Sequence, residues 1–324
     1  MNSICKKSNE RFCLFPIQYQ NIWENHYKKQ LSAFWTRDEV DFSQDYKDYS
    51  KLSKDVQHVI KMILAFFSNS DGLVNFNIQN VFLNEITVNE IRTTYQFQIM
   101  MENIHNEVYS ISLDTIIRDE KEKTDLYNSI KTIPIIKEIS EWALEKSTKE
   151  YYSLSEKLIT FSFVEGVLFS GCFALIYWLK LTMGAGTNIM QGFIKSNELI
   201  SRDEGMHYDF AIEIYNMLED KAPNYLITKT ILEGLSLAKK FNEQILKLKF
   251  ENMNVEKLNQ YSEYLTDRLF VQIGMAKMFN KECPFHFMQS IGMYQKTNFH
   301  ESRVTEYQKP KHFDDEPLKF VDNF

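Results

Sequence analysis

An all-α fold is predicted for this chain of 324 residues by three features of its sequence. Only ten Gly and six Pro are present, which leaves room for long uninterrupted helices. No series of alternating strand-like segments with Asn-Gly or Asp-Gly turns is found, because Asp71-Gly72 lies inside a helical pattern. Two Glu-x-x-His pairs, Glu102–His105 and Glu204–His207, each follow an acid in an apolar stretch, an order typical of four-helix bundles that bind two metal ions.

The acids that complete this order are Asp71 and Glu165, and both are expected to face the core. Glu165 is the only carboxyl group in the apolar run Leu158–Leu179. An unpaired buried carboxylate costs several kcal/mol, roughly, so such a group is usually paired or bound to a metal. Asp71 continues an apolar helical stripe that is formed by Ile60, Leu64 and Phe67. A single Glu-x-x-His pair could be an ordinary helix surface, but the four-part order favours a metal site.

The chemistry of the predicted ligands indicates the class of metal. Residues three apart share a helix face, so each pair can direct a carboxylate and an imidazole to one point. Oxygen-rich ligands with one nitrogen per metal suit iron or manganese, and the absence of thiolate partners argues against zinc fingers and iron–sulfur clusters. The six predicted ligands are Asp71, Glu102, His105, Glu165, Glu204 and His207.

The first half of the chain is expected to place the first three ligands on two long helices. Residues 1–16 are predicted to be irregular, and a first helix covers Ile17–Phe34. Leu52–Ile86 forms one or two helices that carry Asp71, and Val88–Ile117 forms a long helix that carries the first pair. The charge run Asp119–Lys123 reads as solvated loop or helix surface.

The second half repeats the acid-then-pair order and ends in a polar tail. Helices are expected at Ile135–Lys149, Ser153–Leu181 and Glu198–Leu218, with two or three more between Tyr225 and Phe279. Thr182–Ser196 contains three of the ten glycines and is predicted to be a loop. The proposed division is an irregular segment 1–16, a helical domain 17–307 and a flexible tail 308–324.

Composition excludes several classes of protein. The net charge of −7 with mixed signs provides no basic face for nucleic acid. Leu158–Leu179 is long enough to span a bilayer, but Glu165 would then lie in the hydrocarbon, so a buried helix is preferred and no membrane contact is expected. The four cysteines show no CxxC spacing and read as reduced thiols of a cytosolic protein.

Seven segments carry a resemblance to a known family. They read FPIQYQNIW, AFWTRDEVDFSQD, LAFFSNSDGLVN, MENIHNEVYS, VEGVLFSG, SNELISRDEGMH and KTNFHESRVTEYQ. The chain resembles the small, radical-generating subunit of class I ribonucleotide reductase from about Arg11 to Lys309. Other ferritin-like oxygen-activating proteins share only the metal pattern, so these segments together are specific.

The resemblance implies a fold, a cofactor and an activity. It implies a ferritin-like four-helix bundle with additional helices, a cytoplasmic homodimer, and a dinuclear centre of two iron ions per chain, with manganese as a possibility. Such a centre uses dioxygen to generate and store a tyrosyl radical. The radical is passed to a separate large subunit, which reduces ribonucleotides to deoxyribonucleotides for DNA synthesis. The small subunit is active only with that partner.

The resemblance also implies roles for individual residues. Asp71, Glu102 and His105 would bind one metal and Glu165, Glu204 and His207 the other, with some carboxylates bridging. Tyr109, one helical turn after His105, falls at the radical position. Three apolar residues would shield that tyrosine from water: Phe169, Phe173 and Ile200.

A path for the radical to leave is implied as well. Trp23 in the NIW segment and Asp203 would form it together with His105, and Arg202 would support Asp203. Tyr307 would continue the path from the tail toward the large subunit, on which the tip Phe320–Phe324 would dock.

Three departures and two alternatives stay open. Thr182–Ser196 is longer than is typical, the tip FVDNF is short, and Phe76 replaces a common acid, which we expect to change packing rather than chemistry. The first alternative is another ferritin-like di-metal oxidase, such as a desaturase or hydroxylase. The second is a radical-inactive structural or regulatory partner of a second small subunit.

Overall fold

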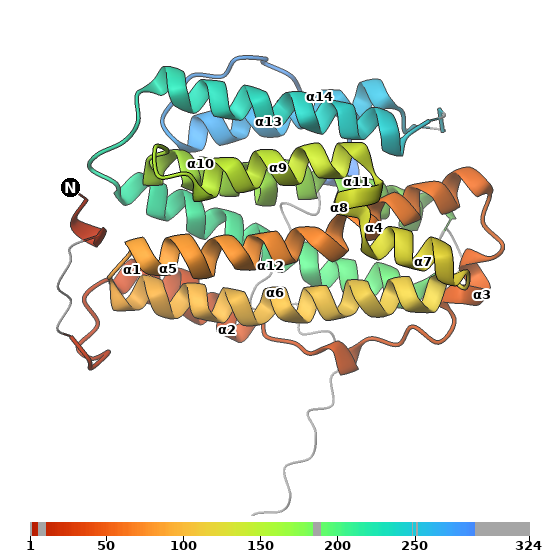
Figure 1. The fold of residues 1–324 in the computed structure, drawn as a ribbon, viewed down its shortest axis with the longest axis horizontal. Helices are drawn as coiled ribbons and strands as arrows, with labels where there is room; N and C mark the ends of the chain where they lie inside the picture. The colour runs from red at the N-terminus through yellow and green to blue at the C-terminus, as the bar shows by residue number, and fades with distance from the viewer. Residues whose placement is uncertain (1, 6–10, 184–188, 248, 251, 289–324) are drawn as a thin grey trace, which may run out of the picture. The chain divides into compact units, whose positions relative to one another are not determined.

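Helices account for all regular secondary structure in the part of the chain that the structure describes (Figure 1). The structure is a computed structural model and describes residues 2–5, 11–183, 189–247, 249–250 and 252–288. Within these ranges the extended backbone is limited to an isolated bridge between Phe250 and Met253. The all-α prediction is confirmed, and Met1–Phe285 forms one compact unit.

Four long helical segments build the bundle that carries the predicted ligands. They are α4 (Lys54–Asn77), α6 (Asn89–Ile116), the continuous run α10 (Leu154–Phe163), η5 (Val164–Leu168) and α11 (Phe169–Met183), and α12 (Gln191–Met217). In Figure 1, α4 and α6 lie side by side, in agreement with their extensive contacts. The third segment also packs on α12. Each segment therefore contributes one face to a shared core.

Local sequence signals explain where these helices begin. The Ser53 hydroxyl caps α4 by accepting from the Val56 amide, at 3.4 Å. Ser153 and Glu156 form a reciprocal capping box at the start of α10. The third segment contains the π-helical turn η5, in which one extra residue is inserted into the helix. Glu165 lies in that turn.

The N-terminal part of the chain contributes short helices around the bundle. They are η1 (Ser3–Cys5), α1 (Gln20–Ile22), the π-helical turn η2 (Trp23–Tyr27), α2 (Lys28–Ser32), η3 (Arg37–Glu39) and α3 (Asp45–Tyr49). The predicted first helix at Ile17–Phe34 is thus present but shorter, and is interrupted by a π turn. Elements η2 and α2 both contact α6.

The remaining helices pack around the four long segments. They are the π turn η4 (Ile78–Phe82), α5 (Leu83–Glu85), α7 (Glu120–Tyr127), α8 (Ser129–Thr132), α9 (Pro134–Thr148), α13 (Asn224–Ile245) and α14 (Val255–Gln272). The predicted charge run starts α7, where the Asp119 side chain caps the helix. Helix α13 packs on α9, α10 and α14 (Figure 1).

The long apolar run lies inside the bundle. Leu154–Thr182 has the length and hydropathy of a membrane span, but 89% of its most apolar window is buried within the protein. This is the behaviour of a core helix in a soluble protein, as the sequence predicted from the position of Glu165.

The prediction that Thr182–Ser196 forms a loop is partly wrong. Helix α11 continues to Met183 and α12 already begins at Gln191, so the connection between the two helices is shorter than predicted. Gly192, counted as a loop residue, lies inside α12, where a glycine is needed because the backbone of Asp41 and Phe42 passes close to it. A Cβ atom at Gly192 would lie 2.6 Å from the Asp41 carbonyl oxygen.

Candidate metal centre

The six predicted ligands come together in the interior of the bundle. Asp71 comes from α4, Glu102 and His105 from α6, Glu165 from η5, and Glu204 and His207 from α12; all six are at most 2% exposed. Ligand atoms lie within 4.8 Å of one another in two groups, one of Asp71, Glu102 and His105 and one of Glu102, Glu165, Glu204 and His207. Because Glu102 belongs to both groups, it is placed to bridge two ions.

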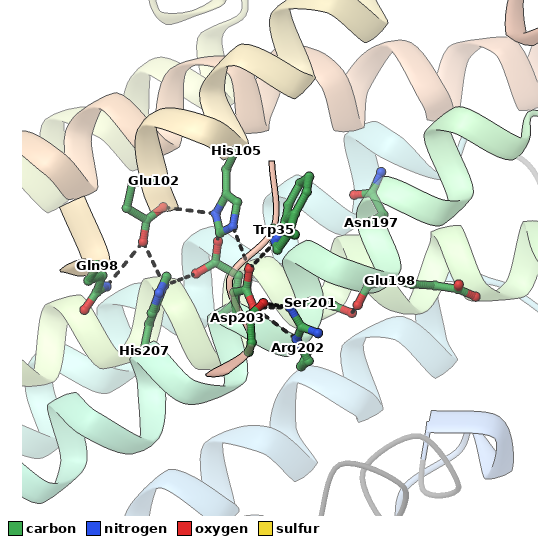
Figure 2. Close-up of polar contacts among 12 residues, drawn as sticks. Trp35, Gln98, Glu102, His105, Asn197, Glu198, Ser201, Arg202, Asp203 and His207 are labelled. Carbon is green, nitrogen blue, oxygen red and sulfur yellow. Dashed lines mark hydrogen bonds and ion pairs between the residues drawn. The ribbon is translucent and has the colours of Figure 1, made fainter. Parts of the chain in front are cut away.

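Imidazole–carboxylate contacts connect α6 to α12 (Figure 2). His207 Nδ1 lies 2.8 Å from Glu102 Oε1 and 3.0 Å from Glu204 Oε2. His105 Nδ1 lies 3.0 Å from Glu204 Oε1. Both histidines therefore direct Nδ1 toward the carboxylates, which is the orientation that two neighbouring metal ligands need.

Burial and the repulsion between neighbouring carboxylates shift the pKa values of the cluster residues. Burial raises the pKa of Asp71 well above its usual range, and the charges of Glu102 and Glu204 add to this effect. Burial, followed by the charge of Glu204, likewise raises the pKa of Glu165. Although burial opposes it, contact with Glu102 and Glu204 raises the pKa of His207 to about 9. The cluster by itself thus retains protons that bound cations would displace.

Unsatisfied polar atoms indicate that the cluster is built for cations. Both carboxylate oxygens of Asp71 and of Glu165 are buried without a hydrogen-bond partner. Buried oxygens without partners are rare, because each costs about 1–3 kcal/mol. Four carboxylates and two imidazoles with free lone pairs fit a dinuclear site for hard or borderline divalent ions.

The outer face of His105 is held by Asp203, whose two oxygens have different partners (Figure 2). His105 Nε2 donates to Asp203 Oδ2 at 3.2 Å, and Trp35 Nε1 donates to the same oxygen at 2.6 Å. Asp203 Oδ1 accepts from Arg202 Nε at 3.1 Å. Arg202 Nη2 also donates to the Ala33 carbonyl at 2.5 Å, which holds the segment that leads into Trp35.

The expected contact between Trp23 and Asp203 is therefore wrong, since Trp35 occupies that position. Trp23 lies in η2, stacked on Tyr27 with ring centroids 4.4 Å apart, and is 9% exposed. The Trp35 ring instead stacks over His105, at 6.0 Å between centroids. Both tryptophans lie in segments that carry the family resemblance, and spacing along the chain does not tell which indole reaches α12.

Tyr109 lies in a buried aromatic pocket beside the cluster. It is fully buried and stacks on Phe67, with centroids 4.6 Å apart and an interplanar angle of 6°. Phe67 in turn contacts Phe169 at 5.1 Å and Phe173 at 5.2 Å. Ile200, also expected in the pocket, is fully buried on α12. Burial raises the pKa of Tyr109 well above its usual value, and the charge of Asp71 acts in the same direction.

Three residues of this region were missed by the sequence analysis. Trp35 and Phe67 carry the aromatic contacts just described, and Asn197 Oδ1 accepts a hydrogen bond from the Tyr109 hydroxyl at 3.0 Å. Phe67 was assigned only to the apolar stripe that leads to Asp71, and nothing in the sequence marked Asn197. Tyr307 and the tip Phe320–Phe324 lie outside the described residues.

Comparison with known proteins gives one consistent result. The sequence model of the family described as "Ribonucleotide reductase, small chain" matches residues 11–284. The ribonucleoside-diphosphate reductase small chain of vaccinia virus (strain Ankara) is 43% identical over 309 residues, which cover 95% of each chain. Subunit M2 of the zebrafish Danio rerio enzyme is 42% identical over 306 residues, or 94% of this chain and 78% of the relative.

A solved structure shares the fold at a comparable level of coverage. The Rnr4 homodimer of ribonucleotide reductase from Saccharomyces cerevisiae aligns with a TM-score of 0.79 and 31% sequence identity. The alignment covers 91% of this chain and 93% of the yeast chain.

Proposed function

This chain belongs to the ribonucleotide reductase small-chain family, and we propose that its buried cluster holds two iron ions that serve to oxidise Tyr109 to a stored radical. The protein is a small subunit of ribonucleoside-diphosphate reductase, an oxidoreductase that reduces ribonucleotides to deoxyribonucleotides. Its own part in that reaction is the proposal developed below.

The proposal depends on one observation above all. A complete set of six ligands and a fully buried tyrosine occupy the same bundle core, with Tyr109 one helical turn beyond His105. A protein that only stored metal would have no need of a buried aromatic pocket around a phenol. When bound, the two ions supply the oxidation by dioxygen that removes an electron from Tyr109.

The pocket residues preserve the oxidised phenol. Phe67 stacks on Tyr109, and Phe169 and Phe173 pack against Phe67, so apolar rings cover this side of the phenol. Exclusion of water and of small reductants is what lengthens the life of a one-electron-oxidised side chain. The high pKa of Tyr109 also keeps the phenol protonated before oxidation.

Trp35, Asp203 and His105 form the route by which the radical would leave. Their hydrogen bonds, at 2.6 Å and 3.2 Å, connect the buried indole of Trp35 to a predicted metal ligand without interruption. Asp203 can exchange a proton with either partner while an electron moves, because it accepts from both. Arg202 donates hydrogen bonds to both the Asp203 carboxylate and the Ala33 carbonyl, and so holds the segment before Trp35 beside Asp203. We assign the continuation of this route, toward the large subunit, to Tyr307.

Membership of the small-chain family implies a large catalytic subunit as partner. We further propose a cytoplasmic homodimer that docks this partner through the tip Phe320–Phe324. The yeast Rnr4 homodimer, at 31% identity, supports the dimer. The intact ligands and Tyr109 count against a radical-inactive partner subunit, and the Trp35–Asp203–His105 route has no use in a desaturase or hydroxylase.

The test is an electron paramagnetic resonance spectrum after ferrous iron and air are added to the metal-free protein. We expect about two irons per chain and a tyrosyl signal that is absent in Tyr109→Phe, while iron binding in that variant is unchanged. Manganese reconstitution in parallel identifies the working metal. Bound iron without a tyrosyl signal, or a signal that persists in Tyr109→Phe, would contradict the proposal.

A further inference from the structure

The hydroxyl of Tyr109 has one hydrogen-bond partner among the described residues, the side-chain amide of Asn197 on α12. The phenol donates to Asn197 Oδ1 at 3.0 Å, and both residues are at most 1% exposed. Asn197 precedes Glu204 by two helical turns and is therefore no part of the metal cluster. An amide in a pocket otherwise lined by aromatic rings requires an explanation.

A second hydrogen bond fixes the orientation of this amide. Asn197 Nδ2 donates to the Phe193 carbonyl at 2.7 Å, one turn earlier on α12. If the amide were reversed, Oδ1 would face that carbonyl and two acceptors would be in contact. Asn197 is therefore held with its acceptor oxygen toward Tyr109. The ring of Tyr109 is equally fixed, because Phe67 stacks flat against it.

Oxidation changes what Tyr109 can offer to this amide. The phenol loses one electron and one proton and becomes a neutral phenoxyl radical. Reduction of dioxygen to two waters takes four electrons and four protons: Tyr109 supplies one of each, the two bound ferrous ions and one further ferrous ion from solution supply the other electrons, and solvent supplies the other protons. The oxygen of Tyr109 then has no hydrogen to donate. With the amide held by Phe193, two acceptors face each other in a buried site, and the hydrogen bond present in the reduced state is lost.

We propose that Asn197 is a positioning residue that raises the reduction potential of the Tyr109 radical, because it stabilises the phenol and not the phenoxyl. This inference depends on the proposed role of Tyr109 as the radical site. A more oxidising radical is passed onward more readily, so Asn197 balances the apolar pocket, which only protects the radical. A net hydrogen bond of ordinary strength corresponds to about a tenfold change in the equilibrium.

The test compares Asn197→Leu, Asn197→Asp and a matched control. Leu removes the acceptor at similar volume. Asp, kept protonated by burial, can accept from Tyr109 with one oxygen and donate to Phe193 with the other, so it should restore the wild-type behaviour. The control is Asn242→Leu, which removes a buried amide on α13 that donates to Asn259 and Ser262. Unfolding of each metal-free variant verifies its fold.

The radical is generated with ferrous iron and air and titrated with one-electron mediators under paramagnetic resonance. In Asn197→Leu, we expect the equilibrium to move about tenfold toward the radical, with Asn197→Asp and Asn242→Leu near wild type. Equal reduction potentials of the radical in all four proteins would overturn this inference but not the proposed function. Equal shifts in Asn197→Leu and Asn197→Asp would do the same. Wild-type protein that binds iron but gives no tyrosyl signal overturns the proposed function and this inference with it.

Discussion

At the scale of single residues, Trp35 and Trp23 can be distinguished by experiment. Trp35 donates to Asp203 at 2.6 Å and stacks over His105, whereas Trp23 stacks on Tyr27. Trp35→Phe keeps an aromatic ring but removes the N–H donor. We expect this variant to form the Tyr109 radical in normal yield yet to lose nearly all nucleotide reduction with the large subunit, since the route is broken outside the cluster.

Trp23→Phe is the matched control, because it makes the same substitution at the neighbouring indole. We expect it to retain most of the turnover. Radical yield is measured by paramagnetic resonance and turnover by deoxyribonucleotide formation. Normal turnover in Trp35→Phe, or its loss in Trp23→Phe alone, would return the role to the residue that the sequence first indicated.

Residue identities alone predicted the ligands but not their surroundings. Asp71 and Glu165 were recognisable because a carboxyl group in an apolar helical stripe is costly and needs a partner. Asn197 and Trp35 carry no such signal, because an amide beside a helical acid and an indole in a connecting segment are both ordinary on a surface. Only the position of α12 against α6 and the segment before η3 gives them their partners.

At the scale of helices, the start of α12 is capped from outside its own sequence. Asp45 of α3 is fully buried and accepts from the Gly192 amide at 3.1 Å and the Phe193 amide at 2.7 Å. Asp48 accepts from the Met190 amide at 3.1 Å. The segment before α12 lacks a side-chain cap of its own, which is why sequence patterns placed the helix start too late. The π turn η5 was equally unpredictable, because it lies in a run that is buried on every side, where an inserted residue leaves no mark on the hydrophobic pattern.

This cap predicts a specific dependence of stability on pH. Burial raises the pKa of Asp45 to about 6, against the lowering effect of its bonds to Phe193 and Gly192. A carboxyl group whose pKa is higher in the folded state holds its proton longer there, so its contribution to stability is lost as pH rises through about 6. Between pH 5 and 7 the wild type should lose roughly 1–1.5 kcal/mol relative to Asp45→Asn, which has no proton to release.

Urea unfolding of the two metal-free proteins at several pH values measures this difference. The absolute stability of Asp45→Asn is of secondary importance, because an amide can satisfy only one of the two backbone donors. A free-energy difference that stays constant across this range would show that Asp45 does not titrate there.

The π turn η5 depends on a glycine. A Cβ atom at Gly166 would lie 2.3 Å from ring carbons of Tyr208, whose hydroxyl is held by Gln272 at 2.5 Å. The ring cannot yield without losing that bond, so Gly166→Ala should destabilise the fold by about 1–3 kcal/mol and displace Glu165, with weaker metal binding. Gly72→Ala is the control: apart from its chain neighbours and the backbone of its own helix turn, no atom lies within 4 Å of its Cβ position.

Gly72, like Gly166, directly neighbours a predicted ligand in a helix, so the two substitutions differ mainly in the space available. Gly72→Ala should be neutral or stabilising by up to about 1 kcal/mol, because Ala is the better helix former. Denaturant unfolding and metal stoichiometry are compared for both variants. Equal effects at the two positions would mean that helix propensity, and not the contact with Tyr208, decides the result.

At the scale of the whole molecule, the cluster joins helices that are distant in sequence. Ligands from α4, α6, η5 and α12 meet at one point, although Asp71 and His207 are separated by more than a hundred residues. The order of ligands could be predicted from helical periodicity, because each lies on the inward face of its own helix. Which ligands contact one another could not be predicted, since this depends on how far each helix is shifted along its neighbour.

Metal binding should therefore stabilise the whole bundle, and should do so more strongly at higher pH. Asp71, Glu165 and His207 bind metal only without their protons, and each has a raised pKa, that of His207 about 9. In the metal-free protein, the raised pKa of His207 gives stability that is present below about 6.5 and is lost as pH rises toward 9. Protons thus compete with the ions most at low pH, and the benefit of metal increases between pH 6 and 8.

Manganese(II) is the suitable probe, because it occupies oxygen-rich sites without the rapid oxidation of ferrous iron. At a free concentration about 100 times its dissociation constant, a bound ion adds about 2.7 kcal/mol, and the same concentration at pH 6 should add markedly less. The melting temperature with and without manganese at pH 6 and pH 8 measures both effects. Glu102→Gln, which weakens the one ligand shared by both groups, should show little manganese-dependent shift at either pH. A shift that is equal at both pH values, or that survives in Glu102→Gln, would mean that the ion binds outside the cluster.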